Sequence, residues 1–248
     1  MAAARTFAAG LLTCLAVLLG LPFLILWTWI TRQPDSMYRV SMSFCRFAVR
    51  LAGIRTRIEG IENIPSGACI FASNHASNLD GLVLLPAIPR RVALLAKREL
   101  FRLPVFGLGM RLAGFVPIDR SGRQATAGIA TAVETLRRGL SIFIFPEGTR
   151  SPDGRLQPFK KGAFAMAIDS GAPMVPVMIA GTHRLLPRGA WIVRPGEVTV
   201  HFAPPVDGSA YIVKERWELL ERVGSVIGAA LPPDQKPERR RAPRPGTA

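Results

Sequence analysis

The chain has 248 residues, of which 49% are hydrophobic and 20% charged, which leaves room for a sizeable core in one α/β domain or two small ones. Its net charge of +15 favours an anionic partner, such as nucleic acid, an anionic lipid surface or a phosphorylated substrate. Nucleic-acid binding would require aromatic residues among the basic ones or a known binding motif; we find neither and expect no nucleic-acid partner.

The N-terminal segment from Thr6 to Thr31 contains no charged residue. At about 1.5 Å per helical residue it is long enough to cross a hydrocarbon layer of roughly 30 Å. A cleavable signal peptide is the alternative, but its apolar region is shorter, and this segment ends in WTWIT, whose tryptophans suit a lipid headgroup region. We therefore expect a retained membrane segment. Pro22 would kink it, so that it either spans the bilayer or dips into one leaflet.

Arginines are more frequent after this segment than before it. Only Arg5 precedes it, whereas six arginines lie between Arg32 and Arg57. The positive-inside rule then places the rest of the protein on the cytoplasmic face of the cell membrane. Ser36–Ala52 has the pattern of an amphipathic helix, which either rests on anionic lipid or packs as an ordinary surface helix. Residues 1–53 are thus predicted to form a membrane-anchoring helical segment.

Short β-branched runs alternate with longer helical patterns over residues 54–231, which predicts one α/β domain with a mostly parallel sheet. The predicted strands are Thr56–Ile64, Cys69–Ser73, Val92–Lys97, Phe115–Asp119, Ser141–Phe145, Met174–Ile179 and Val198–Phe202. The predicted helices are Asp80–Leu85, Pro104–Leu112, Arg123–Arg138, Lys161–Ser170 and Val213–Ala230. Residues 232–248 are rich in proline and arginine, and we expect a disordered basic tail there.

The stretch NHASNLD places His75 just after a predicted strand and Asp80 at the start of a helix. The carboxyl ends of strands are where α/β sheets hold their ligands. If His75 lies in the loop and Asp80 in the first helical turn, the carboxylate can hold one imidazole nitrogen and leave the other free to accept a proton. Alternatively, Asp80 only caps the helix and His75 is solvated. The two remaining histidines, His183 and His201, have no acidic residue close in sequence and are read as ordinary surface residues.

The stretch FPEGTRS follows the buried strand SIFIF and brings Glu147, Gly148, Thr149 and Arg150 to a second strand end. Gly148 allows close approach of the backbone to a ligand, and an arginine suits bidentate contact with phosphate. A plain charged β-turn is the alternative reading. Two further strand ends carry cations, Arg120 in GFVPIDR and Lys97 in LLAKREL, although Arg98 could replace Lys97.

Cys14, Cys45 and Cys69 are widely spaced, and none forms a CxxC pair or lies near a histidine at the spacing of a zinc site. Reduced thiols in a cytoplasmic domain are the simplest interpretation. The sequence predicts no metal site.

The order NHxxxxD, GFVPIDR, FPEGTRS and VPVMIAG resembles the 1-acyl-sn-glycerol-3-phosphate acyltransferase family, the lysophosphatidic acid acyltransferases, over Ile54–Pro205. The resemblance implies a glycerol-3-phosphate acyltransferase-like α/β sandwich behind a membrane-inserting helix. It also implies transfer of a fatty acyl group from acyl-CoA or acyl-ACP to the sn-2 hydroxyl of 1-acyl-glycerol-3-phosphate, giving phosphatidic acid. These thioesters would be substrates, no cofactor is expected, and acyl carrier protein is a potential partner.

The same resemblance implies a role for each site residue. His75 would be the general base and Asp80 its orienting partner. The substrate-binding residues would be Lys97, Arg120, Glu147, Gly148, Thr149 and Arg150, with the cations on the phosphate and the Glu147–Gly148 turn shaping the glycerol pocket. Another lysolipid acceptor, such as lyso-ornithine lipid, stays open. A non-catalytic basic membrane-binding protein is the alternative from a different class, although it leaves His75 and Asp80 without a task.

Overall fold

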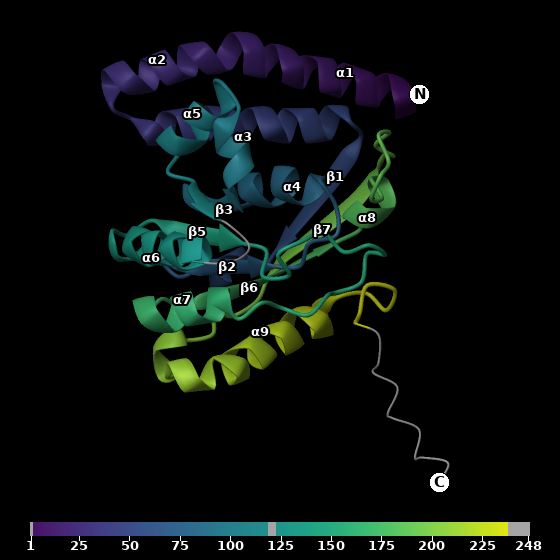
Figure 1. The fold of residues 1–248 in the computed structure, drawn as a ribbon. Coiled ribbons are helices and arrows are strands. Elements are labelled where there is room, and N and C mark those ends of the chain that lie inside the picture. Colours follow the sequence, from purple (N-terminus) through teal and green to yellow (C-terminus); the bar gives the residue numbers. More distant parts are fainter. Residues whose placement is uncertain (1, 119–122, 238–248) are drawn as a thin grey trace.

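The computed structural model describes residues 2–118 and 123–237, and these form a seven-stranded sheet with helices on both faces (Figure 1). The strand order is β1-β7-β6-β2-β5-β3-β4. The strands are β1 (Ile54–Glu59), β2 (Ile70–Ser73), β3 (Val92–Lys97), β4 (Val116–Ile118), β5 (Ser141–Ile144), β6 (Met174–Ala180) and β7 (Gly196–Phe202). The five strands from β6 to β4 run parallel, and only the β6–β7 pairing is antiparallel. The predicted mostly parallel α/β sheet is confirmed.

The helices of the domain are α4 (Leu79–Ala87), α5 (Phe106–Leu112), α6 (Arg123–Arg137), α7 (Gly162–Ser170), α8 (Thr182–Leu185) and α9 (Arg216–Ala230). Short 3-10 turns lie at Ile61–Asn63, Arg98–Arg102, Gly208–Ala210 and Val213–Glu215. The predicted strand Thr56–Ile64 is too long, because Gly60 adopts a left-handed φ of 72° and the chain turns there. The other predicted elements agree with the structure to within a few residues.

Side chains alternate between the two faces of the central strands. Phe71 of β2 joins a core with α3 and α4, whereas its neighbours Ile70 and Ala72 join a second core with α6, α7 and α9. All three are fully buried. A strand covered on both faces must be apolar throughout, which is why these short runs lack the usual hydrophobic and polar alternation. In these central strands, the positions that can carry polar side chains for chemistry are therefore at the strand ends.

The N-terminal segment is α1 (Ala2–Leu15), a π-helical turn (Ala16–Gly20) and α2 (Leu21–Thr31). The turn ends at Leu21, which donates its N–H to the Ala16 carbonyl, five residues back. Pro22 has no N–H to continue the normal ladder, which explains the bend there, visible in Figure 1. Ala3–Thr31 is one helical stretch of 29 residues that by length and composition could cross a membrane.

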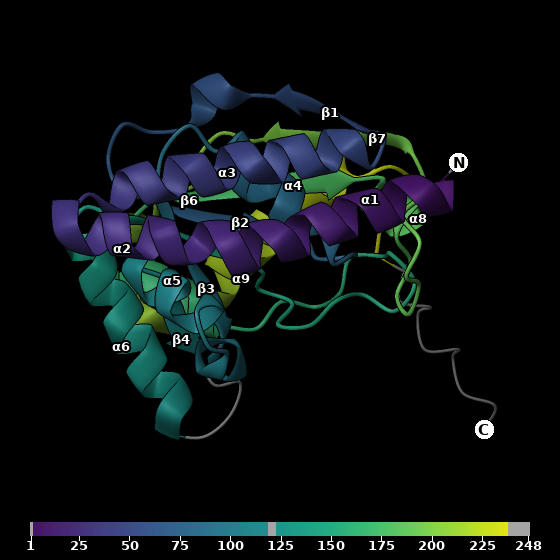
Figure 2. The same ribbon diagram turned by 90° about the horizontal axis from the view of Figure 1, so that it is seen from above.

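The third helix, α3 (Pro34–Leu51), runs beside α1–α2 and contacts α4 and β1 of the domain (Figure 2). Its residues Met37, Tyr38 and Val49 are buried, and the Arg46 guanidinium donates to the Pro86 carbonyl of α4 at 2.6 Å. It therefore packs on the domain, as the surface-helix reading held, while its other side keeps the exposed arginines and apolar residues on which the membrane-resting reading depends. One face packs on the sheet domain and α1–α2 lies alongside the helix, while Val40 and Phe47 stay exposed (Figures 1 and 2).

The predicted disordered tail is wrong for residues 232–237, while 238–248 lie outside the described residues. Leu231 and Gln235 are 2% and 0% exposed, and the Gln235 carbonyl accepts the Leu156 N–H at 2.9 Å. Composition alone suggested disorder because the segment has no apolar run. The buried Leu231 and the hydrogen-bonded side chain of Gln235 nevertheless hold residues 232–237 on the domain.

Candidate active site

The polar residues predicted around the strand ends share one edge of the sheet. Strands β6, β2, β5, β3 and β4 are neighbours and parallel, so their carboxyl ends lie side by side. His75 follows β2, Glu147 follows β5, Lys97 ends β3 and Thr182 follows β6. This edge is the usual ligand-binding side of a parallel sheet.

His75 and Asp80 are in direct contact. The His75 Nδ1 and Asp80 Oδ2 atoms are 2.8 Å apart, with His75 in the loop and Asp80 in the first turn of α4. Because an ionised carboxylate can only accept hydrogen bonds, the Nδ1 atom carries the proton. The predicted contact between the two side chains is confirmed, and it leaves Nε2 as the basic nitrogen of the ring.

Asp80 is completely buried, and its carboxylate is fully hydrogen-bonded. Besides His75, its Oδ2 atom accepts the backbone N–H groups of Ala76 and Ser77 at 2.7 and 2.8 Å, and its Oδ1 atom accepts the Thr182 hydroxyl at 2.6 Å. Four donors compensate the loss of water around a buried charge. Asp80 therefore both organises the loop before α4, as the alternative reading held, and fixes the His75 ring.

The His75 ring is held on its other side by an aromatic stack. Its centroid is 3.9 Å from that of Phe145, with the planes at 15°. The side chain is 20% exposed, and no described residue hydrogen-bonds to Nε2. This nitrogen is therefore available to accept a proton from a molecule in the site.

Asn74, which the sequence analysis did not single out, fixes the position of the loop. Its side-chain amide donates to the Ile179 carbonyl and accepts the Ile179 N–H, both at 2.9 Å. The amide thus continues the pairing of β2 with β6 beyond the last strand residue. An asparagine can replace a peptide group in this way because it has the same donor and acceptor.

Glu147 is buried, and it contacts the backbone of His75. Its Oε1 atom accepts the His75 N–H at 2.8 Å, whereas its Oε2 atom is buried without a hydrogen-bond partner among the described residues. Burial raises the pKa of Glu147 to about 8, more than offsetting the N–H donors of His75 and Gln157, and the Asp80 charge adds to the rise. At neutral pH the carboxyl is mostly neutral. Glu147 thus supports the His75 loop through its backbone, and its place in a glycerol pocket stays a prediction.

The raised pKa of Glu147 predicts a pH-dependent stability. In the unfolded chain this carboxyl loses its proton near pH 4.5, whereas the folded protein keeps it until about pH 8. Folded protein then binds more protons across that window, so the free energy of unfolding falls as pH rises and levels off above it. We expect Glu147→Gln, whose amide oxygen still accepts the His75 N–H, to lose this fall. Thermal melts of both proteins between pH 5 and 9 measure it; parallel curves would contradict it.

Gly148 and its neighbours form the turn after β5. Gly148 has a left-handed φ of 72°, and a Cβ atom there would lie 2.8 Å from the Lys160 side chain. Thr149 is exposed and Arg150 half-buried. Among the residues that the structure describes, no carboxylate pairs with Arg150 or with Lys160. Lys160 lies ten residues beyond Arg150 and was missed by the sequence analysis, since only the fold brings it over the turn.

Among the other predicted cations, the structure does not bring Lys97 to the His75 loop. Lys97 ends β3, two strands away from β2, and its ammonium lies 3.2 Å from Glu99. Strand spacing of about 4.8 Å puts it roughly 10 Å from the His75 loop. Arg98 begins the following 3-10 turn. Arg120 lies outside the described residues.

The remaining histidines do acquire acidic partners through the fold. His183 Nε2 is 3.5 Å from Asp234, and His201 Nδ1 is 3.7 Å from Glu59. Burial lowers the pKa of His183, which keeps its ring neutral at physiological pH. Within the described parts of the chain, no three histidine, cysteine or acidic side chains cluster as metal ligands would.

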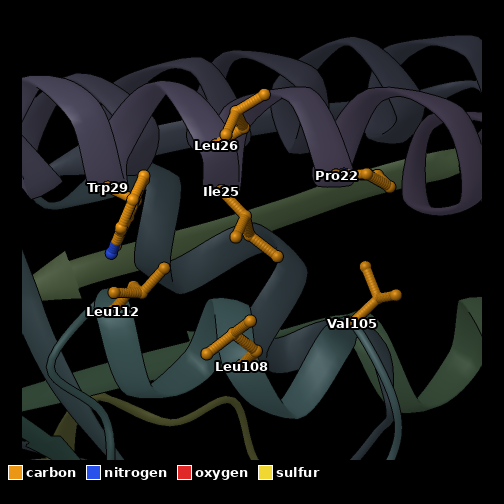
Figure 3. Close-up of a pocket in the computed structure, with 7 residues that line it drawn as sticks. All are labelled: Pro22, Ile25, Leu26, Trp29, Val105, Leu108 and Leu112. Atoms are coloured by element: carbon orange, nitrogen blue, oxygen red, sulfur yellow. The ribbon is translucent and has the colours of Figure 1, made fainter.

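An apolar cavity of about 390 Å³ separates α2 from α5 (Figure 3). Its lining consists of Pro22, Ile25, Leu26, Trp29, Val105, Leu108 and Leu112. Val105 has a φ of 60°, and the Phe106 N–H bonds to the Pro104 carbonyl, which closes a tight turn at the start of α5. Such a positive φ is strained for a β-branched residue. The cavity offers hydrocarbon-lined space between the anchor helices and the domain.

His75 is a base held by a buried carboxylate at the edge of a parallel sheet. Such a base can take the proton of an acceptor hydroxyl directly, so transfer of an acyl group to that hydroxyl needs no serine nucleophile. The family model described as Acyltransferase matches residues 55–180, which contain His75, Asp80 and the turn after β5. The chain belongs to the acyltransferase family.

The relatives of this chain are named for one activity within the acyltransferase family. The 1-acyl-sn-glycerol-3-phosphate acyltransferase of Limnanthes douglasii is 34% identical over 235 residues, 93% of this chain and 82% of the relative. The enzyme of that name from Pseudomonas aeruginosa is 31% identical, over 77% of this chain and 76% of its own. Chloroplastic BAT2 of Brassica napus is 41% identical over 62% of this chain but only 46% of the relative's length.

A solved structure shows the same fold. The crystal structure of the 1-acyl-sn-glycerophosphate (LPA) acyltransferase PlsC from Thermotoga maritima matches with a TM-score of 0.79 at 29% identity, covering 90% of this chain and 91% of that one.

Proposed function

We propose that the protein transfers a fatty acyl group from an acyl thioester to the sn-2 hydroxyl of 1-acyl-glycerol-3-phosphate, giving phosphatidic acid. The observation that carries this proposal is the free Nε2 of His75, whose ring is fixed through Nδ1 by the buried Asp80 carboxylate. The names of the relatives support the acceptor, since each is a 1-acyl-sn-glycerol-3-phosphate acyltransferase.

The reaction needs one proton acceptor, and it needs no acyl-enzyme intermediate. His75 Nε2 takes the proton of the acceptor hydroxyl as its oxygen attacks the thioester carbonyl carbon. The tetrahedral intermediate then expels the sulfur, and the imidazolium returns the proton to the leaving thiolate. Asp80, with its charge already held by four donors, stabilises the imidazolium between these steps.

The acceptor phosphate would bind the cations of the turn after β5. Arg150 and Lys160 carry no ion pair to a described residue, and a guanidinium can hold a phosphate through two parallel hydrogen bonds. Arg120 and Lys97 remain candidates for the same role. A carboxylate can also accept the Arg150 fork, so a lyso-ornithine lipid is the competing acceptor.

The test offers the purified full chain both lipids with radiolabelled acyl-CoA or acyl-ACP and resolves the products. We expect labelled phosphatidic acid and little acylated ornithine lipid. Acylation of lyso-ornithine lipid alone would replace the proposed acceptor, and no acylation of either would support a non-catalytic membrane-binding protein. The two donors side by side decide whether acyl carrier protein is a partner; both are substrates, and the proposal requires no cofactor.

The apolar cavity between α2 and α5 would take part of an acyl chain. Its lining has no charged side chain, and it opens between the membrane-facing helices and the domain (Figure 3). Hydrocarbon leaving the bilayer would enter such a space without meeting a polar group.

We further propose that α1–α2 inserts into the cytoplasmic leaflet of an anionic membrane, with the domain on the cytoplasmic face. The helix lies along α3 across the domain and does not project from it, which favours insertion in one leaflet over a span (Figures 1 and 2). Phe7, Leu11 and Phe23 on it are exposed. The arginines that follow would meet lipid phosphates.

The loop at residues 187–195 would add a second membrane contact. Val193 bonds with Thr6 of α1 through both of its backbone groups, at 2.9 and 3.2 Å. Two residues away, Trp191 is 90% exposed, and Arg188 and Arg194 flank it. An exposed tryptophan among arginines beside an apolar helix is suited to a headgroup region.

We expect Trp191→Ser to weaken partitioning into phosphatidylcholine–phosphatidylglycerol vesicles about tenfold, the equivalent of losing roughly 55 Å² of buried apolar surface. Vesicle flotation measures it. The matched control is Trp217→Ser: this tryptophan is 51% exposed on α9, beyond the opposite face of the sheet, and packs under Lys161. Equal losses in both variants would remove the loop from the membrane surface.

A further inference from the structure

The segment after α9 carries a glutamine that is polar yet completely buried. Gln235 is 0% exposed, and all of its hydrogen-bonding groups are engaged. Its Oε1 atom accepts the Gly181 N–H at 3.0 Å, and its Nε2 atom donates to the Gly154 carbonyl at 3.4 Å. Its backbone carbonyl accepts the Leu156 N–H at 2.9 Å. One residue thus joins two loops that are far apart in sequence.

The first of these loops leads directly to Asp80. Gly181 has a left-handed φ of 98°, and a Cβ atom there would lie 2.6 Å from the Glu197 carbonyl oxygen, so the backbone at this point is tightly confined. The next residue is Thr182, fully buried, whose hydroxyl donates to Asp80 at 2.6 Å. The position of the Gly181 N–H therefore sets where the Thr182 hydroxyl meets the carboxylate.

The second loop leads to His75. Residues 151–157 begin with Ser151, whose N–H donates to the His75 carbonyl at 2.8 Å. Near its end, the backbone N–H of Gln157 acts to lower the pKa of the Glu147 carboxyl, which itself accepts the His75 N–H. Gly154 and Leu156, which bind Gln235, lie between these two contacts.

We infer that Gln235 is a positioning residue for the His75–Asp80 pair, acting through Thr182 on one side and the 151–157 loop on the other. The surface contacts of its neighbours, Asp234 and Lys236, contribute little to this positioning. Asp234 pairs with Arg184 at 2.6 Å and Arg155 donates to the Lys236 carbonyl at 3.3 Å, but both lie in solvent, where such contacts are weak. The buried amide is the part that links the two loops.

The test variant is Gln235→Met, which keeps the volume and removes both side-chain hydrogen bonds. The inference rests on the proposed acyl transfer, so wild-type activity is measured first. We expect kcat to fall about tenfold while the KM for lysophosphatidic acid changes less than about twofold, because the base is misplaced and the phosphate cations are not. The control is Lys236→Met, the next residue along, whose side chain is exposed and should leave kcat unchanged.

A double variant separates positioning from general loosening. Thr182→Val alone should lower kcat, since Asp80 loses a donor. If Gln235 acts in part through Thr182, adding Gln235→Met should lower kcat further by clearly less than its effect in wild type. Multiplicative effects, or a wild-type kcat in Gln235→Met, would overturn the inference.

If Gln235→Met proves unfolded in its thermal melt, Gln235→Glu carries the test. It keeps an acceptor for the Gly181 N–H but loses the donor to the Gly154 carbonyl, so it should lower kcat through the 151–157 loop alone and by the same factor in the Thr182→Val background; a wild-type kcat in Gln235→Glu would equally overturn the inference. An inactive wild type would instead overturn the proposed function and leave the contacts of Gln235 untouched.

Discussion

His75→Ala should reduce kcat by about 10³-fold, within the range of roughly 10²–10⁴ that a positioned general base contributes. The ring is fixed by Asp80 through Nδ1, and its Nε2 has no hydrogen-bond partner among the described residues. Because His75 is one-fifth exposed and its backbone N–H, not its ring, binds Glu147, the variant should fold. Initial rates with lysophosphatidic acid and an acyl thioester measure the effect.

The control for this experiment is His201→Ala. His201 lies on β7 and its ring meets only Glu59, so its loss should leave turnover near the wild-type rate. If His75→Ala kept more than about a tenth of the wild-type kcat, the proton would be removed by another group and the proposed mechanism would be wrong.

Asp80→Asn should lower kcat by at least about 10²-fold although the site keeps its shape. Asparagine can turn its oxygen toward the Ala76 and Ser77 N–H groups and its amide toward Thr182, whose hydroxyl can accept as well as donate. Every hydrogen bond around residue 80 can then be retained. Only the charge that stabilises the imidazolium is lost, so the variant separates charge from geometry.

The readout is kcat alongside a thermal melt, with Asp169→Asn as the control because Asp169 is an exposed carboxylate near the end of α7. A folded Asp80→Asn protein with near wild-type kcat would show that the carboxylate serves only to cap α4 and organise the loop. That outcome would support the alternative interpretation of NHASNLD, in which Asp80 only caps the helix.

Much of the sheet was predictable because its strands are short, apolar and bounded by turns. The strand Val92–Lys97 agrees at both ends, and β2, β5 and β6 agree to within a residue or so. The His75–Asp80 contact was predictable too, since both residues belong to one loop and the helix after it. Interactions within about ten residues depend on local geometry, which the order of residue types expresses directly.

The support around that pair could not be predicted in this way. Thr182 lies 102 residues from Asp80, Gln235 lies 54 residues from Gly181, and Asn74 lies 105 residues from Ile179. In sequence, a threonine in AGTHRLLP or a glutamine in a proline-rich tail has no distinguishing pattern. The resemblance assigned Glu147 to the glycerol pocket, and only the fold reveals its burial and its contact with the His75 backbone.

The sequence by itself determined the class of fold, the apolar N-terminal helix and the contact between His75 and Asp80, because these depend on hydrophobic periodicity and on neighbours in the chain. Only the tertiary structure decided that α3 packs between α4 and the α1–α2 helix pair, that residues 232–237 are fastened to the domain, and that four donors hydrogen-bond the buried Asp80 carboxylate. The physical reason is that burial and hydrogen-bond completion are properties of the packed whole: a polar group is stabilised or strained by whichever distant segment the folded chain brings beside it.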